Sequence, residues 1–258
     1  MTGIAKIALL IEYEGTGYHG FQVQSNVPTI QEELEKAIQK ITGEKIRLHG
    51  AGRTDAGVHA KGQVAAFEFA SAFSPLSLVR AMNAYLPPDI VVKDACQVEA
   101  SFNPRRDALS REYRYTIMNG SLPSPFSRRW AYFKPRKLDV SAMNKACEIM
   151  KGEHDFASFT NSEGRAKNTI RTVFKTEVRK KNDFISIDMV ANAFLPQQVR
   201  RTVGYLVEIG SGNMGAGDFY EMINSGRIGL AEHVVPPHGL CLMKVNYSDI
   251  GFRNYENI

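Results

Sequence analysis

The chain has 258 residues, a length that suits one large domain or two small ones. Apolar residues make up 43% and charged residues 23%, close to the averages of soluble globular proteins, so disorder, a collagen-like repeat and a coiled coil are excluded for the whole chain. The net charge is +5 and its excess is local, because residues 101–136 carry 8 Lys and Arg against 2 Asp and Glu, while residues 1–100 carry 9 against 11.

The first hundred residues are predicted to form a strand, a helix, two strands, a helix and a strand. Lys6–Tyr13 alternates with the period of a strand. Thr29–Glu32 is a capping box, and apolar residues then recur on one helical face up to Ile41. The further elements are strands at 45–50 and 63–69, a helix at 74–86 that stops before Pro87, and a strand at 90–98. This order is that of a ferredoxin-like βαββαβ unit.

The rest of the chain is predicted to repeat this order around a Pro-containing insertion from Leu122 to Arg136. The expected elements are a strand at 111–118, a helix at 139–150, strands at 169–179 and 184–191, helices at 197–209 and 219–223, and a strand at 240–247. We therefore predict an α+β fold of two ferredoxin-like halves, residues 1–104 and 105–258, that share an extended antiparallel sheet. A cleft between the halves is then the natural place for a ligand.

A second basic stretch runs from Arg165 to Arg201 and contains strand-like patterns. It includes Lys167, Arg171, Lys175, Arg179, Lys180 and Lys181. A folded face with such charge attracts polyanions, nucleic acids among them. Solvated Lys and Arg at sheet edges explain the same pattern, so charge alone leaves both interpretations open.

The chain shows no stretch near eighteen consecutive apolar residues, and its N-terminus lacks the pattern of a signal peptide. We therefore expect a protein that neither spans a membrane nor is exported. Its cysteines, Cys96, Cys147 and Cys241, are an odd number and lie far apart. This spacing favours reduced thiols in the cytoplasm over a disulfide framework or a zinc site, and no metal is expected.

Gly15–Gly20 matches the dinucleotide fingerprint G-x-G-x-x-G and follows a predicted strand. That fingerprint requires a helix that starts at its glycines, whereas here the helix cap comes only at Thr29. A nicotinamide or flavin site is therefore disfavoured. The segment is interpreted either as a structural turn or as a tight loop that presents aromatic and polar groups at the end of a sheet.

Gly50–His59 is the most unusual stretch of the chain. Three glycines in it permit backbone conformations with positive φ, and among them lie Arg53, Thr54 and Asp55. A loop between strands holds such side chains on a rigid scaffold while leaving them accessible. A solvated turn in which Asp55 serves only as a cap explains the same residues, and composition alone favours that turn.

Arg53–Ala60 resembles the signature of the tRNA pseudouridine synthases of the TruA family. Further segments resemble that family in the same order along nearly the whole chain. They are Tyr13–Thr16, Gly20–Gln22, Thr29–Leu34, Phe102 with Arg105, Arg111–Tyr115, His154–Phe156, Thr169–Arg171, Phe194–Leu195, Val199–Arg200, Gly204 and Pro236–Leu240. The fold of that family, two ferredoxin-like halves that share a sheet, agrees with the order of elements predicted above.

The resemblance implies an enzyme that isomerises uridine to pseudouridine in the anticodon arm of tRNA, at positions 38, 39 and 40. The bond from ribose to uracil N1 is broken and the base is rejoined through C5, with no net change in composition and no redox step. The resemblance therefore implies no cofactor. It also implies a cytoplasmic homodimer, with the tRNA spanning both subunits.

The same resemblance suggests roles for four residues. Asp55 is implied to be the catalytic carboxylate, which either adds to the sugar or base or removes a ribose proton. Arg200 is implied to keep that carboxylate ionised, because a carboxylate among apolar groups otherwise takes up a proton. Tyr113 is implied to pack against the flipped uracil, and Arg53 to fill the vacated space or bind a phosphate. Without the resemblance, Tyr113 is interpreted as an aromatic residue of the core, and Arg53 as part of a salt bridge in a turn. His59 is expected to form a hydrogen bond within the loop.

The chain departs from the family pattern at a few positions. Phe21 replaces a tryptophan, Val23 stands where a basic residue is frequent, and Pro196–Gln198 replaces a run with aromatic, His or Met residues. The alternative from another class is a non-catalytic RNA-binding module. It is disfavoured because the aromatic pattern of an RNA-recognition motif is absent and because Asp55 places a negative charge where phosphates would bind.

Overall fold

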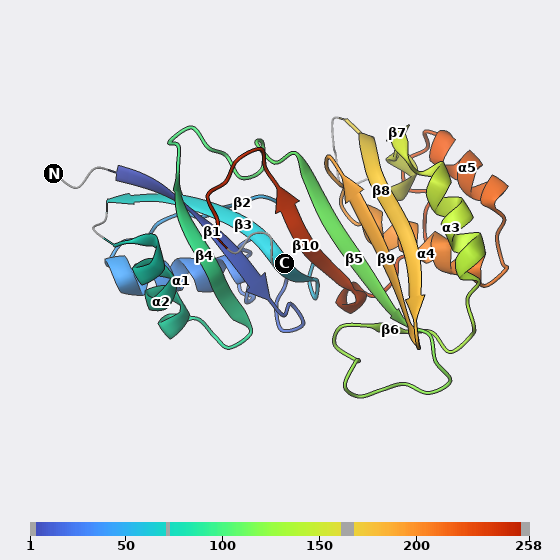
Figure 1. Cartoon of the computed structure of the whole chain (residues 1–258), viewed down its shortest axis with the longest axis horizontal. Helices are drawn as coiled ribbons and strands as arrows, with labels where there is room; N and C mark the ends of the chain where they lie inside the picture. Colours follow the sequence, from blue (N-terminus) through green and yellow to red (C-terminus); the bar gives the residue numbers. More distant parts are fainter. Residues whose placement is uncertain (1–3, 71–72, 161–167, 254–258) are drawn as a thin grey trace. The chain divides into compact units, whose positions relative to one another are not determined.

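The computed structural model describes residues 4–70, 73–160 and 168–253, and it confirms the predicted α+β class (Figure 1). The chain forms two compact units, the first made of Met1–Leu109 with Leu242–Ile258 and the second of Ser110–Cys241. The division into halves at 104 and 105 stays a prediction. The compact units differ from it because residues from Leu242 onward, predicted to complete the second half, pack with the first unit. Arg165 and Lys167 of the basic stretch lie outside the described residues.

The first unit contains the elements β1 (Ile4–Tyr13), α1 (Ile30–Thr42), β2 (His49–Gly50), β3 (His59–Ala70), α2 (Pro75–Tyr85), β4 (Ile90–Val98) and most of β10 (Leu240–Asn246). Its strands lie in the order β4-β1-β3-β10, and β2 pairs with β3. The central strand β1 is antiparallel to both neighbours, with Ile7 opposite Phe67 on β3 and Ala8 opposite Cys96 on β4. The consecutive residues Ile7 to Ile11 are all buried, so β1 is covered on both faces as well as paired on both edges.

Local capping places the two helices of this unit. The Thr29 hydroxyl accepts a hydrogen bond from the Glu32 amide at the start of α1, and Ser74 caps α2 in the same way. Ile30, Leu34 and Ile38 form the buried face of α1. The two helices pack side by side, and α2 contacts β4 (Figure 1).

The second strand is shorter than predicted, since β2 pairs only at His49 and Gly50. The reason lies in α1, whose side chains take the backbone groups of Leu48. The Leu48 amide donates to the Glu35 carboxylate at 3.0 Å, and the Gln31 side-chain amide donates to the Leu48 carbonyl at 2.9 Å. Those backbone groups are therefore not available to a strand partner.

The second unit contains β5 (Ser110–Met118), β6 (Tyr132–Phe133), α3 (Val140–Ile149), β7 (Gly152–Asp155), the short helix η1 (Ala157–Phe159), β8 (Ile170–Lys181), β9 (Phe184–Ala191), α4 (Gln198–Gly210), α5 (Ala216–Asn224) and the short helix η2 (Pro237–Gly239). Its strands lie in the order β5-β9-β8-β7, and β6 pairs with β5. Helix α3 packs on β8 and α4, and the apolar faces of β5 and β9 form the core. The short elements β6, β7, η1 and η2 were not predicted.

No helix in the described residues has the length and apolar character needed to cross a membrane. Within the same part of the chain, no three His, Cys, Asp or Glu residues are grouped so as to hold a metal ion. All three cysteines are free, as predicted. Burial raises the pKa of the Cys96 and Cys147 thiols to about 11, so both remain protonated at neutral pH.

Candidate active site

The aspartate loop (residues 51–58) connects β2 to β3 and is bound to the loop that follows β1, here called the aromatic loop (residues 14–21). The Phe21 amide donates to the Thr54 carbonyl at 3.1 Å, and the Gly57 amide donates to the Tyr18 carbonyl at 3.2 Å. Two segments that lie more than thirty residues apart in the sequence are thus joined directly by their backbones.

Glycines make this close approach possible. A Cβ atom on Gly15 would lie 2.0 Å from the Val58 carbonyl oxygen, and one on Gly20 would lie 2.6 Å from the Thr54 carbonyl oxygen. Gly20 also has a φ of +90°, which residues with a side chain rarely adopt. Two of the three glycines of the apparent dinucleotide fingerprint, Gly15 and Gly20, therefore serve the contact between the two loops.

Replacing Gly15 by alanine is expected to lower the free energy of unfolding by roughly 1–3 kcal/mol, because the new methyl group must displace a backbone carbonyl rather than a flexible side chain. Gly17→Ala is the matched control, since a Cβ there meets nothing within 4 Å. Urea denaturation of both variants checks this. Equal stability of the two variants would contradict the contact described for Gly15.

Side chains fix the base of the two loops. The buried His59 ring accepts a hydrogen bond from the Gly15 amide through Nδ1 at 3.0 Å, which is the structural role expected for it. The hydroxyls of Tyr13 and Thr54 lie 2.8 Å apart. Tyr18 donates to the Asp89 carboxylate at 2.6 Å, and burial, helped by this carboxylate, raises the pKa of Tyr18 above its ordinary value.

Asp55 follows directly on the buried Thr54 and is itself half-buried. Its carbonyl accepts a hydrogen bond from the Val58 amide at 3.1 Å, which closes a tight turn in the middle of the loop. The Asp55 backbone is thus held on both sides, because Thr54 before it is buried and the turn after it is closed by a hydrogen bond. A carboxylate placed in this way is positioned yet reachable from solvent.

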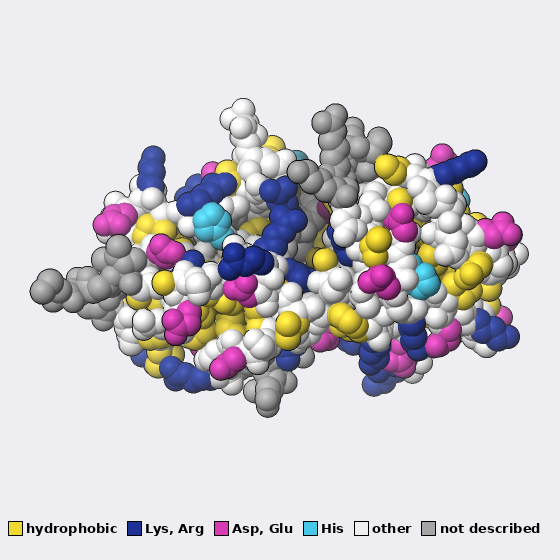
Figure 2. Space-filling view, turned by 90° about the horizontal axis from the view of Figure 1, so that it is seen from above, with side chains coloured by type: hydrophobic (Ala, Val, Ile, Leu, Met, Phe, Trp, Pro, Cys, Tyr) yellow, Lys and Arg dark blue, Asp and Glu magenta, His cyan; other side chains and the backbone are white. Residues whose placement is uncertain are grey.

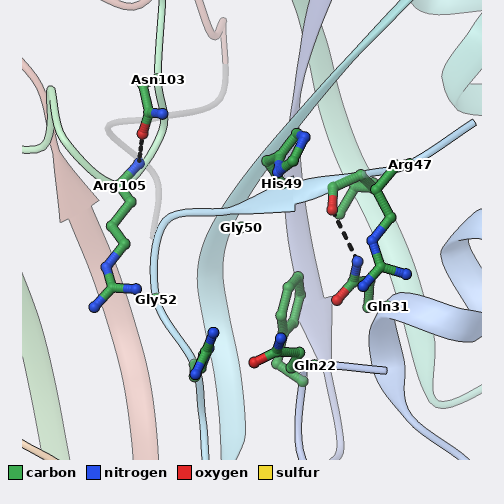
Figure 3. Close-up of a pocket in the computed structure, with 11 residues that line it drawn as sticks. Gln22, Gln31, Arg47, His49, Gly50, Gly52, Asn103 and Arg105 are labelled. Atoms are coloured by element: carbon green, nitrogen blue, oxygen red, sulfur yellow. Dashed lines mark hydrogen bonds between the residues drawn. The ribbon is translucent and has the colours of Figure 1, made fainter. Parts of the chain in front are cut away.

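A pocket of about 350 Å³ lies beside the aspartate loop within the first unit (Figure 3). Its lining is Phe21, Gln22, Gln31, Arg47, Leu48, His49, Gly50, Gly52, Arg53, Asn103 and Arg105. Figure 3 shows Arg105 on one side of the pocket and Arg47 on the other. The lining holds three arginines and one histidine and no carboxylate, so the pocket suits an anion. Asp55 does not line it.

The pocket lies next to Val23, the position at which the family frequently has a basic residue. The Val23 amide donates to the Gln31 side-chain oxygen at 3.2 Å, and Gln31 lines the pocket together with Arg47. Arg47 shares this pocket with Gln31, and its guanidinium pairs with the Glu35 carboxylate at 3.4 Å. Basic side chains also gather beside a histidine on the surface shown in Figure 2.

Tyr113 and Arg200 belong to the second unit, so they are described apart from Asp55 and Arg53. Tyr113 is half-buried on β5, opposite Met189 of β9. Its ring packs perpendicular to that of Phe194, at a centroid distance of 5.3 Å and an interplanar angle of 90°. Such an edge contact fixes the orientation of the Tyr113 ring.

Arg200 lies in the first turn of α4, and its Nε donates to the Val235 carbonyl at 2.9 Å. The carbonyl of the next residue, Pro236, which directly precedes η2, accepts a hydrogen bond from the buried Tyr115 hydroxyl at 2.8 Å. Gly239 is required here, because a Cβ on it would lie 2.5 Å from the Tyr115 ring. One short segment therefore holds both the arginine and the strand that carries Tyr113.

Arg201, the neighbour of Arg200, has a different environment. It donates to the carbonyl of Ala231 and, at 3.0 Å, to the side chain of Gln197. Burial, and secondarily the charge of Arg200, lowers the pKa of Arg201. Arg201 thus links α4 to the segment around Ala231, and it is half-buried, as Arg200 is.

Sequence reasoning missed several residues of these sites. Arg47, Gln31 and His49 line the pocket beside the aspartate loop, and the Val235 carbonyl accepts the hydrogen bond of Arg200. Arg47 and His49 are separated by one residue just before the glycine-rich stretch, which was the available signal. The carbonyl of Val235 left no signal, because a backbone acceptor is independent of residue type.

Comparisons with known proteins agree with the motifs. The sequence profile of the family described as tRNA pseudouridine synthase matches residues 9–105 and 146–248. The tRNA pseudouridine synthase A of Geobacter sp. (strain M21) is 43% identical over 244 residues, which cover 94% of this chain and 99% of that protein. The proteins of the same name from Citrifermentans bemidjiense and Thermoanaerobacter sp. (strain X514) are 43% and 41% identical, covering 94% and 93% of this chain and 98% and 99% of theirs. The family inferred from the motifs is thereby confirmed: the chain belongs to the tRNA pseudouridine synthases.

Proposed function

We propose that this enzyme, an isomerase of uridine to pseudouridine in tRNA by its family, acts on the anticodon arm at positions 38, 39 and 40, with Asp55 as its catalytic residue. The aspartate loop carries this proposal. Its backbone is bound to the aromatic loop at Thr54 and Gly57, so Asp55 is held in place before substrate arrives.

A single carboxylate suffices for the chemistry. The glycosidic bond from ribose C1′ to uracil N1 breaks, the base turns, a bond forms from C1′ to C5, and the proton on C5 is lost while N1 gains one. Atoms and electrons balance without an external oxidant or reductant. Asp55 either adds covalently to sugar or base or removes a ribose proton, and both routes need its ionised form.

The uridine must leave its stack to reach such a carboxylate, and an aromatic surface offsets part of the stacking that is lost. We assign this role to Tyr113, whose ring orientation is fixed by the edge contact with Phe194. Arg53 is proposed to bind a phosphate of the substrate, supported by its place in a pocket with Arg47 and Arg105.

Arg200 is proposed to keep the reacting carboxylate ionised. Arg200→Met should lower turnover at neutral pH, and raising the pH should restore part of it, because the ionised carboxylate is then formed without the help of a cation. Arg200→Lys keeps the charge and should retain more activity. The pH dependence of kcat/KM for both variants is the measurement. A methionine variant with full activity near neutral pH would leave Arg200 with a structural role only.

The position of the product tests the proposed target directly. Mapping pseudouridine in tRNA after incubation with the enzyme should locate it at positions 38, 39 or 40 and at no other uridine. Pseudouridine at other positions of the tRNA would confirm the isomerase activity but would contradict the anticodon arm as its target. The proposal also includes a homodimer in the cytoplasm, for which sedimentation at micromolar concentration should give twice the mass of the chain.

A further inference from the structure

The insertion loop (residues 119–137) of the second unit is tied firmly at its base. The Asn119 side-chain amide donates to the carbonyls of Lys134 and Arg136, both at 2.8 Å. The Asn119 backbone amide donates to the Asp183 carbonyl at 2.6 Å, which joins the insertion loop to the turn between β8 and β9. Asn119 is buried, so these bonds are shielded from water.

Three large apolar side chains nevertheless point into solvent from this loop. Phe126 is 91% exposed, Leu122 74% and Trp130 46%. Trp130 stacks on Phe184 of β9 at a centroid distance of 5.1 Å and an interplanar angle of 23°, and its indole N–H donates to the Phe126 carbonyl at 2.9 Å. The loop thus holds its aromatic residues in an ordered, outward position, and such a surface marks an interaction site.

The charge of the same surface is strongly positive. The insertion loop contains five cations and no carboxylate. The end of β8 adds Lys180 and Lys181, opposed by Asp183 in the turn that follows. Lys180 Nζ lies 3.4 Å from the Asn119 side-chain oxygen, so the turn and the base of the insertion loop are in contact. Arg128, two residues from Phe126, is exposed. Cations interleaved with exposed aromatic rings favour a polyanion that carries unstacked bases.

We propose that the insertion loop and the β8–β9 turn form a docking surface for RNA, separate from the aspartate loop, on which Lys180, Lys181 and Arg128 bind backbone phosphates and Phe126 stacks on an exposed base. The proposal rests on tRNA being the substrate. A second copy of the chain fits this surface less well, because a two-fold contact would bring the same cations face to face.

The test is the salt dependence of tRNA binding by the whole enzyme. Lys180→Gln with Lys181→Gln should flatten the plot of log affinity against log salt by about 1 for each lysine, and should weaken binding roughly tenfold or more at low salt. Lys145→Gln with Arg227→Gln removes the same charge from exposed positions elsewhere in the second unit and should leave the slope unchanged. Equal slopes in the two double variants would overturn the proposal.

Phe126→Ser separates RNA docking from association between protein chains. Because Phe126 is almost fully exposed, the substitution should leave the melting temperature unchanged while weakening tRNA binding several-fold. The rate of a single turnover at saturating tRNA should stay within about twofold of wild type, as the surface acts before the chemistry. If instead sedimentation shows loss of an oligomer and tRNA affinity is unaltered, the surface is a protein interface and the proposal is wrong. Absence of pseudouridine formation by the wild type would count against the proposed function alone, since these binding experiments need no turnover.

Discussion

Asp55→Asn should reduce turnover by more than about a hundredfold while tRNA affinity stays close to that of wild type. Asparagine has nearly the same shape as aspartate, so the turn closed by the Asp55 carbonyl and the backbone bond at Thr54 are preserved. The substitution removes only the charge that is proposed to react. Rates are measured by tritium release from tRNA labelled at uridine C5, and affinity by equilibrium binding of the same tRNA.

Asp249→Asn is the control for this variant, because Asp249 is an exposed aspartate in the same unit and should tolerate the change. The two variants should melt at the same temperature as wild type. Residual activity of Asp55→Asn within tenfold of wild type would reject Asp55 as the reacting group, whatever the behaviour of the control.

Tyr113→Phe is expected to be strongly impaired in turnover although it still binds tRNA. Phenylalanine keeps the ring, its edge contact with Phe194 and a stacking surface worth about 1–3 kcal/mol per base, so any loss isolates the hydroxyl. We attribute to this hydroxyl the relay of the proton that leaves C5 in the last step. Single-turnover kinetics with C5-tritiated tRNA should therefore show slow tritium release in the phenylalanine variant.

Two further substitutions serve as controls for the Tyr113→Phe variant. Tyr113→Leu should be impaired whichever role the residue has, because both the ring and the hydroxyl are lost. Tyr220→Phe removes the hydroxyl of an exposed tyrosine in α5 and should behave as wild type. Tritium release by Tyr113→Phe at a near wild-type rate would restrict Tyr113 to stacking.

Local signals in the sequence predicted the helices well, because their starts are set by short-range bonds. Thr29, Ser74 and Asp139 all cap the helices that follow them, each through a hydrogen bond three residues along the chain. Strand ends depend on distant partners instead. Leu48 reads as part of a strand, yet its backbone is bound by the side chains of Gln31 and Glu35 from α1, which no local pattern reveals.

The candidate site could be predicted from its unusual residue types and from resemblance. The contacts that hold its residues in place could not be predicted. Nothing local to Gly15 indicates that it meets the Val58 carbonyl, since that contact joins segments far apart in the chain. The same holds for Arg200, whose acceptor is the backbone of Val235, and for Arg47, which shares a pocket with Arg53 and Arg105. Side chains that react are recognisable by type, but those that position them are recognisable only once the chain is folded.

The most direct test of the central claim is to incubate the purified protein, with nothing else added, with tRNA that carries tritium at uridine C5. Tritium should be released in proportion to the pseudouridine formed in the anticodon arm, and Asp55→Asn should release none above background. Binding of the tRNA with a strong salt dependence but without tritium release or pseudouridine would contradict the claim, and would identify the protein as an RNA-binding module.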